Sequence, residues 1–381
     1  MDLLKLSKNY LNHSYHFDID KKIYNGLETK MNITFLIGNG FDINIGLKTS
    51  YADFYKYLKN QNYEKKENKL IKNIINDYFQ KEILGDYEGD IEKIDWSDFE
   101  IAIGSYTEKI KTEDDIEEFI KNYEEFIDYF TEYIERNLDV NIQEFLVEEN
   151  LSNFESSIRF PINTYERDQR NLDEKYSHYK NTVKNLNYII FNYTEIFDLF
   201  HKNWIEHYSQ GGINSNSPIH IHGYCQEQIL LGVNDESQID SKLSSNEDLQ
   251  MMMIKTISNQ YALSTRMERT TSVIKESNLI IIYGMSMGES DKYWWEMVLN
   301  VLREDFNKSV LIYAYETDQR GLMKHHRRMM SKQKEWKDKL LKYALEEEKE
   351  NLSRQIFIQF DTLKIFNFSK LNPVVLKELT N

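Results

Sequence analysis

Cysteine and proline are scarce in this sequence. A single cysteine, Cys225, occurs among 381 residues, so the chain can form no internal disulfide bond and no zinc site built from several cysteines. We therefore expect a protein of the reducing cytoplasm. Only three prolines are present, which favours a well-packed chain that tolerates long helices.

Long apolar runs and an excess of positive charge are also lacking. The longest clean apolar run, Leu279–Tyr283, is far shorter than the roughly 20 residues that a membrane-spanning helix needs. Asp2, Lys5 and Asn9 interrupt the N-terminus, so no apolar signal segment is visible there. The net charge of −16 is opposite in sign to that of most nucleic-acid-binding proteins. We expect neither a membrane nor a nucleic acid as a partner.

The composition is that of a globular protein. Hydrophobic residues make up 40% of the chain and charged residues 29%, which is enough apolar material for a sizeable core. The length suits one large α/β domain or two smaller ones.

The chain is organised around residues 32–54. The apolar, β-branched run Ile33–Ile37 predicts a strand buried on both faces. The strand ends at Gly38-Asn39-Gly40, and a helical pattern follows. Such a turn could offer free N–H groups to a phosphate, although it could equally be an ordinary turn without a ligand. Ile43 stands where the dinucleotide fingerprint needs its third glycine, which disfavours a standard nicotinamide dehydrogenase.

Further strands alternate with helical segments along the chain. This alternation predicts an α/β fold with a doubly wound, mostly parallel, Rossmann-like sheet. Residues 1–30 are expected to be an N-terminal extension, and 31–381 an α/β domain with a helical insertion at about 55–185. Residues 355–368 are expected to form a hairpin or two short strands.

Glycines and polar residues follow the predicted strands where those strands end. They are Gly38, Asn39, Gly40 and Asp42 after the first strand, Asn192 after the second, His222 after a shorter one, and Gly284, Ser286 and Asp291 after the next. Because ligands bind at the carboxyl ends of strands in such sheets, their convergence predicts a ligand site. The acidic and polar loop 235–248 is expected to cover it. We expect no metal, because the close histidine pairs, His220 with His222 and His325 with His326, have no evident further ligands.

Six segments resemble, in order, the AbiH family of bacterial phage abortive-infection proteins. They are residues 31–54, 96–100, 191–194, 220–223, 231–235 and 281–291. The resemblance implies a role in phage defence, with a phage-derived trigger or a defence partner protein. It leaves open whether copies of the chain form a homo-oligomer.

The same order of motifs resembles, more distantly, the sirtuin-type NAD-binding domain. By this resemblance Gly38-Asn39-Gly40 and Gly284-Met285-Ser286 bind the dinucleotide, Asn192 is the catalytic asparagine and His222 is the catalytic base. The four-cysteine zinc module of the deacetylases cannot form with one cysteine, and Asp42 stands near where sirtuins have serine. The resemblance therefore implies hydrolysis of NAD or a related nucleotide at the nicotinamide–ribose bond, rather than peptide deacetylation.

This chemistry suits the residue types. Asn192 can orient a ribose hydroxyl or a water through its amide, and His222 titrates near neutrality and can act as a base. The glycine turn and Ser286 could hold the pyrophosphate. Asp42 and Asp291 could contact sugar hydroxyls or cap helices.

Two alternatives remain open. Gly284-Met285-Ser286-Met287-Gly288 fits the nucleophile elbow of serine hydrolases, with Asp318 and His325 or His326 available downstream. The pocket could also sense a nucleotide without cleaving it, while the helical insertion signals to a partner.

Overall fold

The computed structural model describes most of the chain. The described residues are 30–61, 67–84, 96–138, 146–162, 167–177, 182–207, 211–243, 245–262, 264–360 and 365–369. The N-terminal extension expected at residues 1–30 lies outside them except for Lys30, which is the first residue of strand β1.

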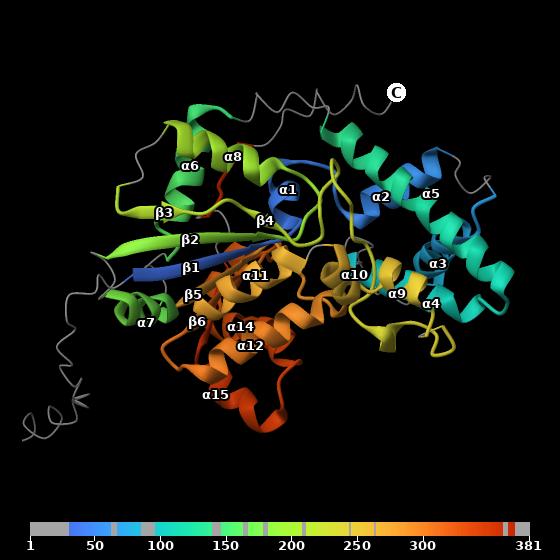
Figure 1. The fold of residues 1–381 in the computed structure, drawn as a ribbon. Helices are drawn as coiled ribbons and strands as arrows, with labels where there is room; N and C mark the ends of the chain where they lie inside the picture. The colour runs from blue at the N-terminus through green and yellow to red at the C-terminus, as the bar shows by residue number, and fades with distance from the viewer. Residues whose placement is uncertain are drawn as a thin grey trace, which may run out of the picture.

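A parallel sheet forms the centre of the molecule (Figure 1). Its order is β3-β2-β1-β5-β6-β7, with β4 paired to β2, and every pairing is parallel. The strands are β1 (Lys30–Ile37), β2 (Val183–Ile190), β3 (Ile213–Ser215), β4 (Ile219–His220), β5 (Leu279–Tyr283), β6 (Ser309–Tyr313) and β7 (Ile356–Gln359). The expected doubly wound α/β fold is confirmed.

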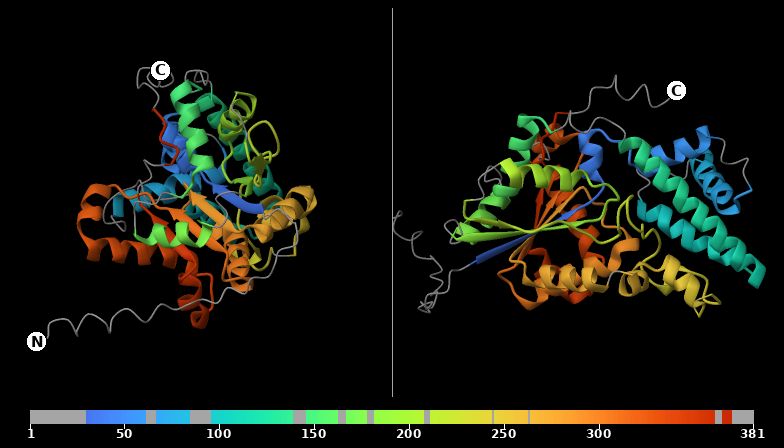
Figure 2. Two further views of the ribbon diagram at one scale, coloured as in Figure 1. Left: turned by 90° about the vertical axis from the view of Figure 1, so that its left-hand side faces the viewer. Right: turned by 45° about the horizontal axis from the view of Figure 1, so that its top comes forward.

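Helices cover both faces of this sheet, as Figures 1 and 2 show. One face packs against α1 (Gly40–Ile45), α6 (Glu148–Arg159), α7 (Arg167–Tyr176) and α8 (Ile196–His207). The other packs against α11 (Ser264–Glu276), α12 (Lys292–Glu304), α14 (His326–Leu341) and α15 (Lys349–Ser353), and the short α13 (Gln319–Lys324) precedes α14. β5 and β6 are buried at every position, which explains why they are continuously apolar.

A second group of helices lies beyond the carboxyl ends of the strands (Figure 2, right). It consists of α2 (Tyr51–Asn60), α3 (Lys69–Leu84), α4 (Trp96–Tyr106), α5 (Glu113–Leu138), α9 (Glu247–Met253) and α10 (Lys255–Ala262). We call these helices the helical block. Its core is aromatic, with Phe54 packed edge-on against Phe126 and Phe130, and Tyr193 from the end of β2 reaches into it. Of the helices in the expected insertion, α2–α5 belong to this block, whereas α6 and α7 pack on the sheet.

The hairpin expected at residues 355–368 is wrong. In the described part of this segment only β7 is a strand, and it pairs in parallel with β6. The free edge of β6 accepts a strand arriving from α15. The aromatic residues farther along, Phe366 and Phe368, instead pack edge-on against Phe41 in the core beneath α1, α6 and α8. An apolar run alone does not reveal which of these uses it serves.

Three glycines fix the point where the chain reverses its winding direction, between β1 and β5. The Gly38 N–H donates to the Tyr283 carbonyl, and the Gly40 N–H donates to the Gly284 carbonyl, both at 2.9 Å. A Cβ added to Gly40 would lie 2.5 Å from the Gly284 Cα. The turns after β1 and β5 therefore touch through bare backbone, which explains why glycine stands on both sides.

We predict that Gly284→Ala strongly destabilises the fold. Its φ is +69°, and an added Cβ would lie 2.8 Å from the Gly40 Cα, so strain and overlap act together. We expect a loss of about 2–5 kcal/mol in the free energy of unfolding, measured by urea titration. Gly212→Ala is the matched control, because φ is +73° there but no described atom lies within 4 Å of the added Cβ. It should cost about 1 kcal/mol. Equal losses in the two variants would contradict the close-packing explanation.

Candidate functional site

Asp42 lies in the first turn of α1 and is fully buried. The Thr194 hydroxyl donates to its Oδ2 at 2.7 Å. Its Oδ1 has no hydrogen-bond partner among the residues that the structure describes. Burial raises the pKa of Asp42 to about 6, although Thr194, Asn192 and His220 each lower it. A carboxyl group is therefore held in the interior with half of its hydrogen-bonding capacity unused.

Asn192 follows β2 and is only 3% exposed. It lies close enough to Asp42 to lower the pKa of that carboxyl. Neither its amide nitrogen nor its amide oxygen, however, forms a hydrogen bond of good geometry within the described part of the chain. A buried amide without partners costs about 1–3 kcal/mol, so such groups in a native protein call for an explanation. A bound ligand or water that pairs with the amide would remove this cost.

His222 lies in the turn after β4 and is 2% exposed. Ile190 and His220 are register partners in β2 and β4, so Asn192 and His222 each come two residues after a paired position. The His222 Nε2 lies 2.8 Å from the Asp291 Oδ1. Its Nδ1 has no partner among the described residues. His220 shows the same arrangement, because its Nε2 pairs with Asp198 of α8 at 2.6 Å and its Nδ1 also has no partner among the described residues.

His222 belongs to a cluster of four ionisable side chains, which we call the buried ionic cluster: Glu100, His222, Lys255 and Asp291. The Lys255 Nζ lies 2.8 Å from the Glu100 Oε2 and 3.2 Å from the Asp291 Oδ1. Glu100 comes from α4, Lys255 begins α10, and Asp291 ends the 3₁₀ turn Glu289–Asp291 before α12. The cluster thus joins the helical block to the sheet.

The charges in this cluster are unequal. Burial opposes ionisation of Asp291, but Lys255 and His222 outweigh burial and hold its pKa well below the usual range. Burial raises the pKa of Glu100 to about 7 despite the attraction of Lys255, and the charge of Asp291 adds to the rise. Burial and Lys255 both lower the pKa of His222, against the opposing pull of Asp291. Of the two carboxyl groups that Lys255 contacts, Asp291 therefore keeps its negative charge more readily than Glu100.

The remaining predicted residues lie around the turns at the switch point. The Asn39 Nδ2 donates to the Thr49 carbonyl at 2.7 Å and so anchors the first turn. Gly38, Gly40 and Gly284 bring the two backbones together, and the N–H groups of Gly38 and Gly40 are used in doing so. Ser286 is exposed. The assignment of these residues to a cofactor stays a prediction.

Asp291 does not cap α12 with its side chain, which settles one alternative left open by the sequence. Its carboxylate instead pairs with His222 and Lys255. Glu100 and Lys255 were not among the residues predicted for the site. Their position next to apolar residues could have identified them. Glu100 precedes the apolar run Ile101–Ile103, and Lys255 directly follows Met251–Ile254. A charge placed inside an apolar stretch is costly unless it is paired.

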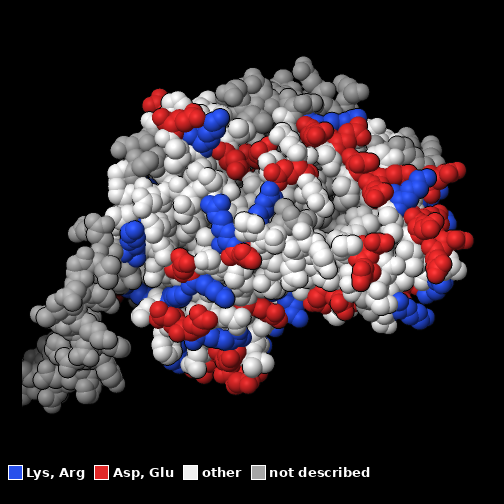
Figure 3. Space-filling view, viewed as in Figure 1, with Lys and Arg blue, Asp and Glu red and all other residues white. Residues whose placement is uncertain are grey.

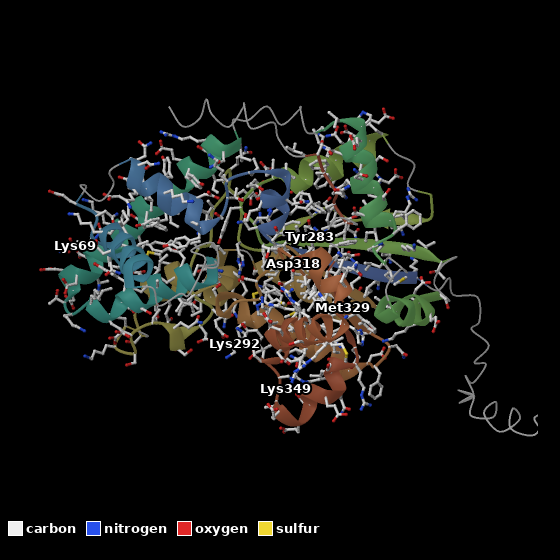
Figure 4. All side chains as sticks on the ribbon, turned by 180° about the vertical axis from the view of Figure 1, so that it is seen from behind. Lys69, Tyr283, Lys292, Asp318, Met329 and Lys349 are labelled. Carbon is white, nitrogen blue, oxygen red and sulfur yellow. The ribbon has the colours of Figure 1, made fainter. Side chains whose placement is uncertain are left out.

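The described geometry does not support a serine hydrolase centre. Positive φ values occur at Gly284 and Met287, whereas a nucleophile elbow places the strained turn at the serine itself. The Asp318 carboxylate caps α13 through the Gly321 N–H and pairs with Arg328, each at 3.0 Å. Figure 4 labels Asp318 in the view from behind. His325 and His326 are exposed at the start of α14.

A cleft of about 1000 Å³ lies between α5, α8 and the segments on either side of β4, which contribute Ser217, Pro218, Cys225 and Gln226. Carboxylates dominate its charged walls: Glu132, Glu135, Glu195, Asp198 and Glu206, against Arg136 and Lys202. None of the predicted site residues is among the described residues that line it. Asp198, which holds His220, does line it, so the cleft adjoins the site while Asn192 and His222 stay enclosed.

The loop expected to cover the site is attached to the helical block. Its apolar residues Ile239 and Leu243 are buried in the core of the block, and the Asp240 N–H donates to the Thr107 hydroxyl at 2.8 Å. Asp235 caps a 3₁₀ turn with a capping box that Gln238 completes. These contacts fix the described part of the loop on α4 and the turn after it, and its role as a cover of the site stays a prediction.

Two further features were searched over the described residues. No three His, Cys, Asp or Glu side chains there gather as metal ligands would, so the expected absence of a metal stays a prediction. None of the helices in these ranges combines the length and the apolar character needed to cross a membrane.

We predict that Asp42→Asn stabilises the protein at alkaline pH. The pKa is about 6 in the fold and 3.8 for an ordinary aspartate, so folding favours the protonated carboxyl. This contribution is fully present below pH 3.8 and is lost as the pH rises through about 6. By urea unfolding, the variant should exceed the wild type by up to about 3 kcal/mol at pH 8, and the gap should close toward pH 4. Asp128→Asn, at an exposed position of α5, should show no such trend. A difference between Asp42→Asn and wild type that does not vary with pH would refute the assignment.

Comparison with known proteins identifies the family. No curated protein matches the chain. The family model described as "Bacteriophage abortive infection AbiH" matches residues 34–315, which run from β1 to just past β6 and include every residue of the candidate site. The chain therefore belongs to the AbiH family of bacteriophage abortive-infection proteins, and its role lies in phage defence.

Proposed function

We propose that this AbiH protein acts by hydrolysing the nicotinamide–ribose bond of NAD or of a related nucleotide. The observation that carries the proposal is the pair of unsatisfied groups at neighbouring strand ends: the amide of Asn192 and the Nδ1 of His222. Both are nearly inaccessible, and neither has a partner among the described residues. Hydrogen-bonding groups kept in this state at the carboxyl edge of a parallel sheet fit a ligand site.

The reaction requires little from the protein. Nicotinamide leaves from a positively charged nitrogen, so the bond from the ribose C1′ breaks without a strong general acid. The sugar then passes through an oxocarbenium-like state, as in other glycosidic cleavages. Asn192 orients the attacking water or a ribose hydroxyl. The water oxygen bonds to C1′, and its proton passes to the Nδ1 of His222, which acts as the base. The products are nicotinamide and ADP-ribose.

The glycine turns contribute shape to this site more than hydrogen-bond donors. The N–H groups of Gly38 and Gly40 are already bonded to the turn after β5. Their missing side chains let the two turns pack directly against each other, and Ser286 supplies an exposed hydroxyl nearby in sequence. In this proposal Asp42 meets a sugar hydroxyl with its unpaired Oδ1.

The surface charge favours a small nucleotide over a nucleic acid. Figure 3 shows Asp and Glu side chains gathered over the helical block, whose longest helix, α5, begins with Glu113, Asp114 and Asp115. A duplex backbone would be repelled there. A phage-derived trigger or a partner protein that engages the block stays a prediction.

One observation favours a second function, nucleotide sensing without cleavage. Asn192 and His222 are 3% and 2% exposed, so a ligand reaches them only if surrounding elements separate. The helical block closes over this edge of the sheet through Glu100, Tyr193 and Lys255. Ligand binding would then move the block, which is what a sensor needs.

We predict that Asn192→Ala and His222→Ala each lower nicotinamide release from NAD by about a hundredfold or more. Asn192→Ala should change the melting temperature little, because the amide forms no hydrogen bond of good geometry with the described residues, although it lies close to Asp42. His222→Ala should cost about 1–3 kcal/mol, since Asp291 loses its hydrogen bond. The matched control is Asn68→Ala. Asn68 is a buried asparagine of the helical block. Its amide donates to the Asn122 carbonyl and its Oδ1 accepts from the Ile71 N–H at the start of α3, so its loss should lower stability.

The outcomes separate the candidate functions. Undiminished cleavage by His222→Ala would sink the proposed mechanism. A wild-type protein that releases no nicotinamide, but whose melting temperature rises with NAD or ADP-ribose, would identify the sensor. Ser286→Ala should retain at least about a tenth of wild-type cleavage, because a pyrophosphate contact is one of several. If Ser286→Ala abolished cleavage while Asn192→Ala and His222→Ala retained it, the serine hydrolase alternative would have to be reconsidered.

A further inference from the structure

Lys255 is a buried lysine that the proposed reaction does not use. Its side chain is only 5% exposed, and its Nζ lies 2.8 Å from Glu100 and 3.2 Å from Asp291. An ammonium group in the interior is costly unless carboxylates compensate it. A lysine that only filled space here could be replaced by an apolar residue without that cost. The contacts of Asp291 show what the charge does.

A single oxygen of Asp291 serves two donors. Its Oδ1 lies 2.8 Å from the His222 Nε2 and 3.2 Å from the Lys255 Nζ. An ionised carboxylate can only accept hydrogen bonds, so the Nε2 of His222 must carry a proton. The same carboxylate on its own would also favour a second proton on the imidazole, as an aspartate does beside a histidine.

Lys255 opposes that second proton. Its positive charge shares the Asp291 oxygen with the imidazole, so an imidazolium would place two cations against one carboxylate oxygen. Burial acts in the same direction. The other groups that face the imidazole are the rings of Phe191 and Tyr193, with centroids at 5.6 and 6.5 Å, and the Tyr193 hydroxyl stays neutral because burial raises its pKa well above the ordinary value.

We infer that Lys255, held in place by Glu100, is a positioning residue that keeps His222 neutral, with its proton on Nε2 and its lone pair on Nδ1. The inference builds on the proposed role of His222 as the base, because a base needs that free lone pair. Its test observes the imidazole in the protein without substrate, so it stands or falls separately from NAD cleavage.

The position of Glu100 gives this arrangement a regulatory consequence. Glu100 belongs to α4 of the helical block, whereas His222 and Asp291 follow strands of the sheet. If the helical block withdraws, Lys255 leaves with Glu100, because α10 belongs to the same block, and Asp291 is left to face His222 without the competing ammonium. The imidazole then takes up a proton and can no longer act as a base. Movement of the block would in this way switch the base off.

The experiment is nitrogen-15 NMR of histidine-labelled full-length protein, with His222 identified by difference from His222→Ala among the nine histidines. In the wild type near pH 7 we expect the neutral form protonated on Nε2. In Lys255→Met we expect the imidazolium at the same pH, with proton affinity raised at least tenfold. Lys255→Arg keeps the charge and should restore the neutral form.

Lys292→Met is the matched control. Lys292 is next to Asp291 in sequence, its side chain is 40% exposed, and it contacts Glu296 at 3.8 Å; Figure 4 labels it near the surface. The variant removes the same charge and should leave His222 unchanged. If Lys255→Met does not fold, Glu100→Gln/Lys255→Met removes the stranded carboxylate as well and should still give the imidazolium.

Two results would overturn the inference. One is a wild-type His222 protonated on Nδ1 or on both nitrogens near pH 7. The other is a Lys255→Met protein, or the double variant, in which His222 keeps its neutral form and its titration midpoint. Nicotinamide release by the wild type is measured in parallel. Absence of release together with the expected spectra would reject the NAD proposal and leave the role of Lys255 intact.

Discussion

Bare backbone contact between the turns after β1 and β5 determines where the polar groups of this protein can lie. Gly40 and Gly284 touch with no side chain between them, so the two central strands end at the same level. The chain then leaves in opposite directions from this point, to β2 on one side and β6 on the other. Asp42, Asn192 and Asp291 all follow strands whose ends this contact aligns.

Burying each of these polar groups away from water is unfavourable in free energy, and two different arrangements are found around them. In the buried ionic cluster the charges compensate one another across four segments of the chain. Around Asp42 and Asn192, by contrast, the Asp42 Oδ1 and both polar atoms of the Asn192 amide have no hydrogen bond of good geometry in the described residues. A fully paired network is typical of side chains that the fold itself orients. Unpaired buried groups are typical of a site where a ligand or a water binds. The two arrangements adjoin each other, because Asn192 and His222 follow the neighbouring strands β2 and β4.

Much of the sheet could be predicted from the sequence, because β5, β6 and the stretch Ile33–Ile37 of β1 are buried at every position and are therefore rich in apolar residues. The polar residues at strand ends were predicted for the same reason, since a strand end fixes where its next residue lies. Glu100 and Lys255 could not be predicted in this way. They are 155 positions apart, and both sit in helices whose docking surface the local pattern does not specify. The segment after Phe360 was misjudged because its aromatic residues serve a packing role on the opposite face.

The helical block takes its core from two stretches of chain that are far apart. The Tyr123 hydroxyl of α5 donates to the Leu231 carbonyl, and Cys225, Leu231 and Ile254 pack among the rings of α2–α5. During synthesis α2–α5 therefore leave the ribosome well before the residues that complete their core, and parts of the aromatic surface wait uncovered until the later stretch arrives. His222 meets Asp291 later still. Most of the chain must therefore be synthesised before the residues of the buried ionic cluster can come together.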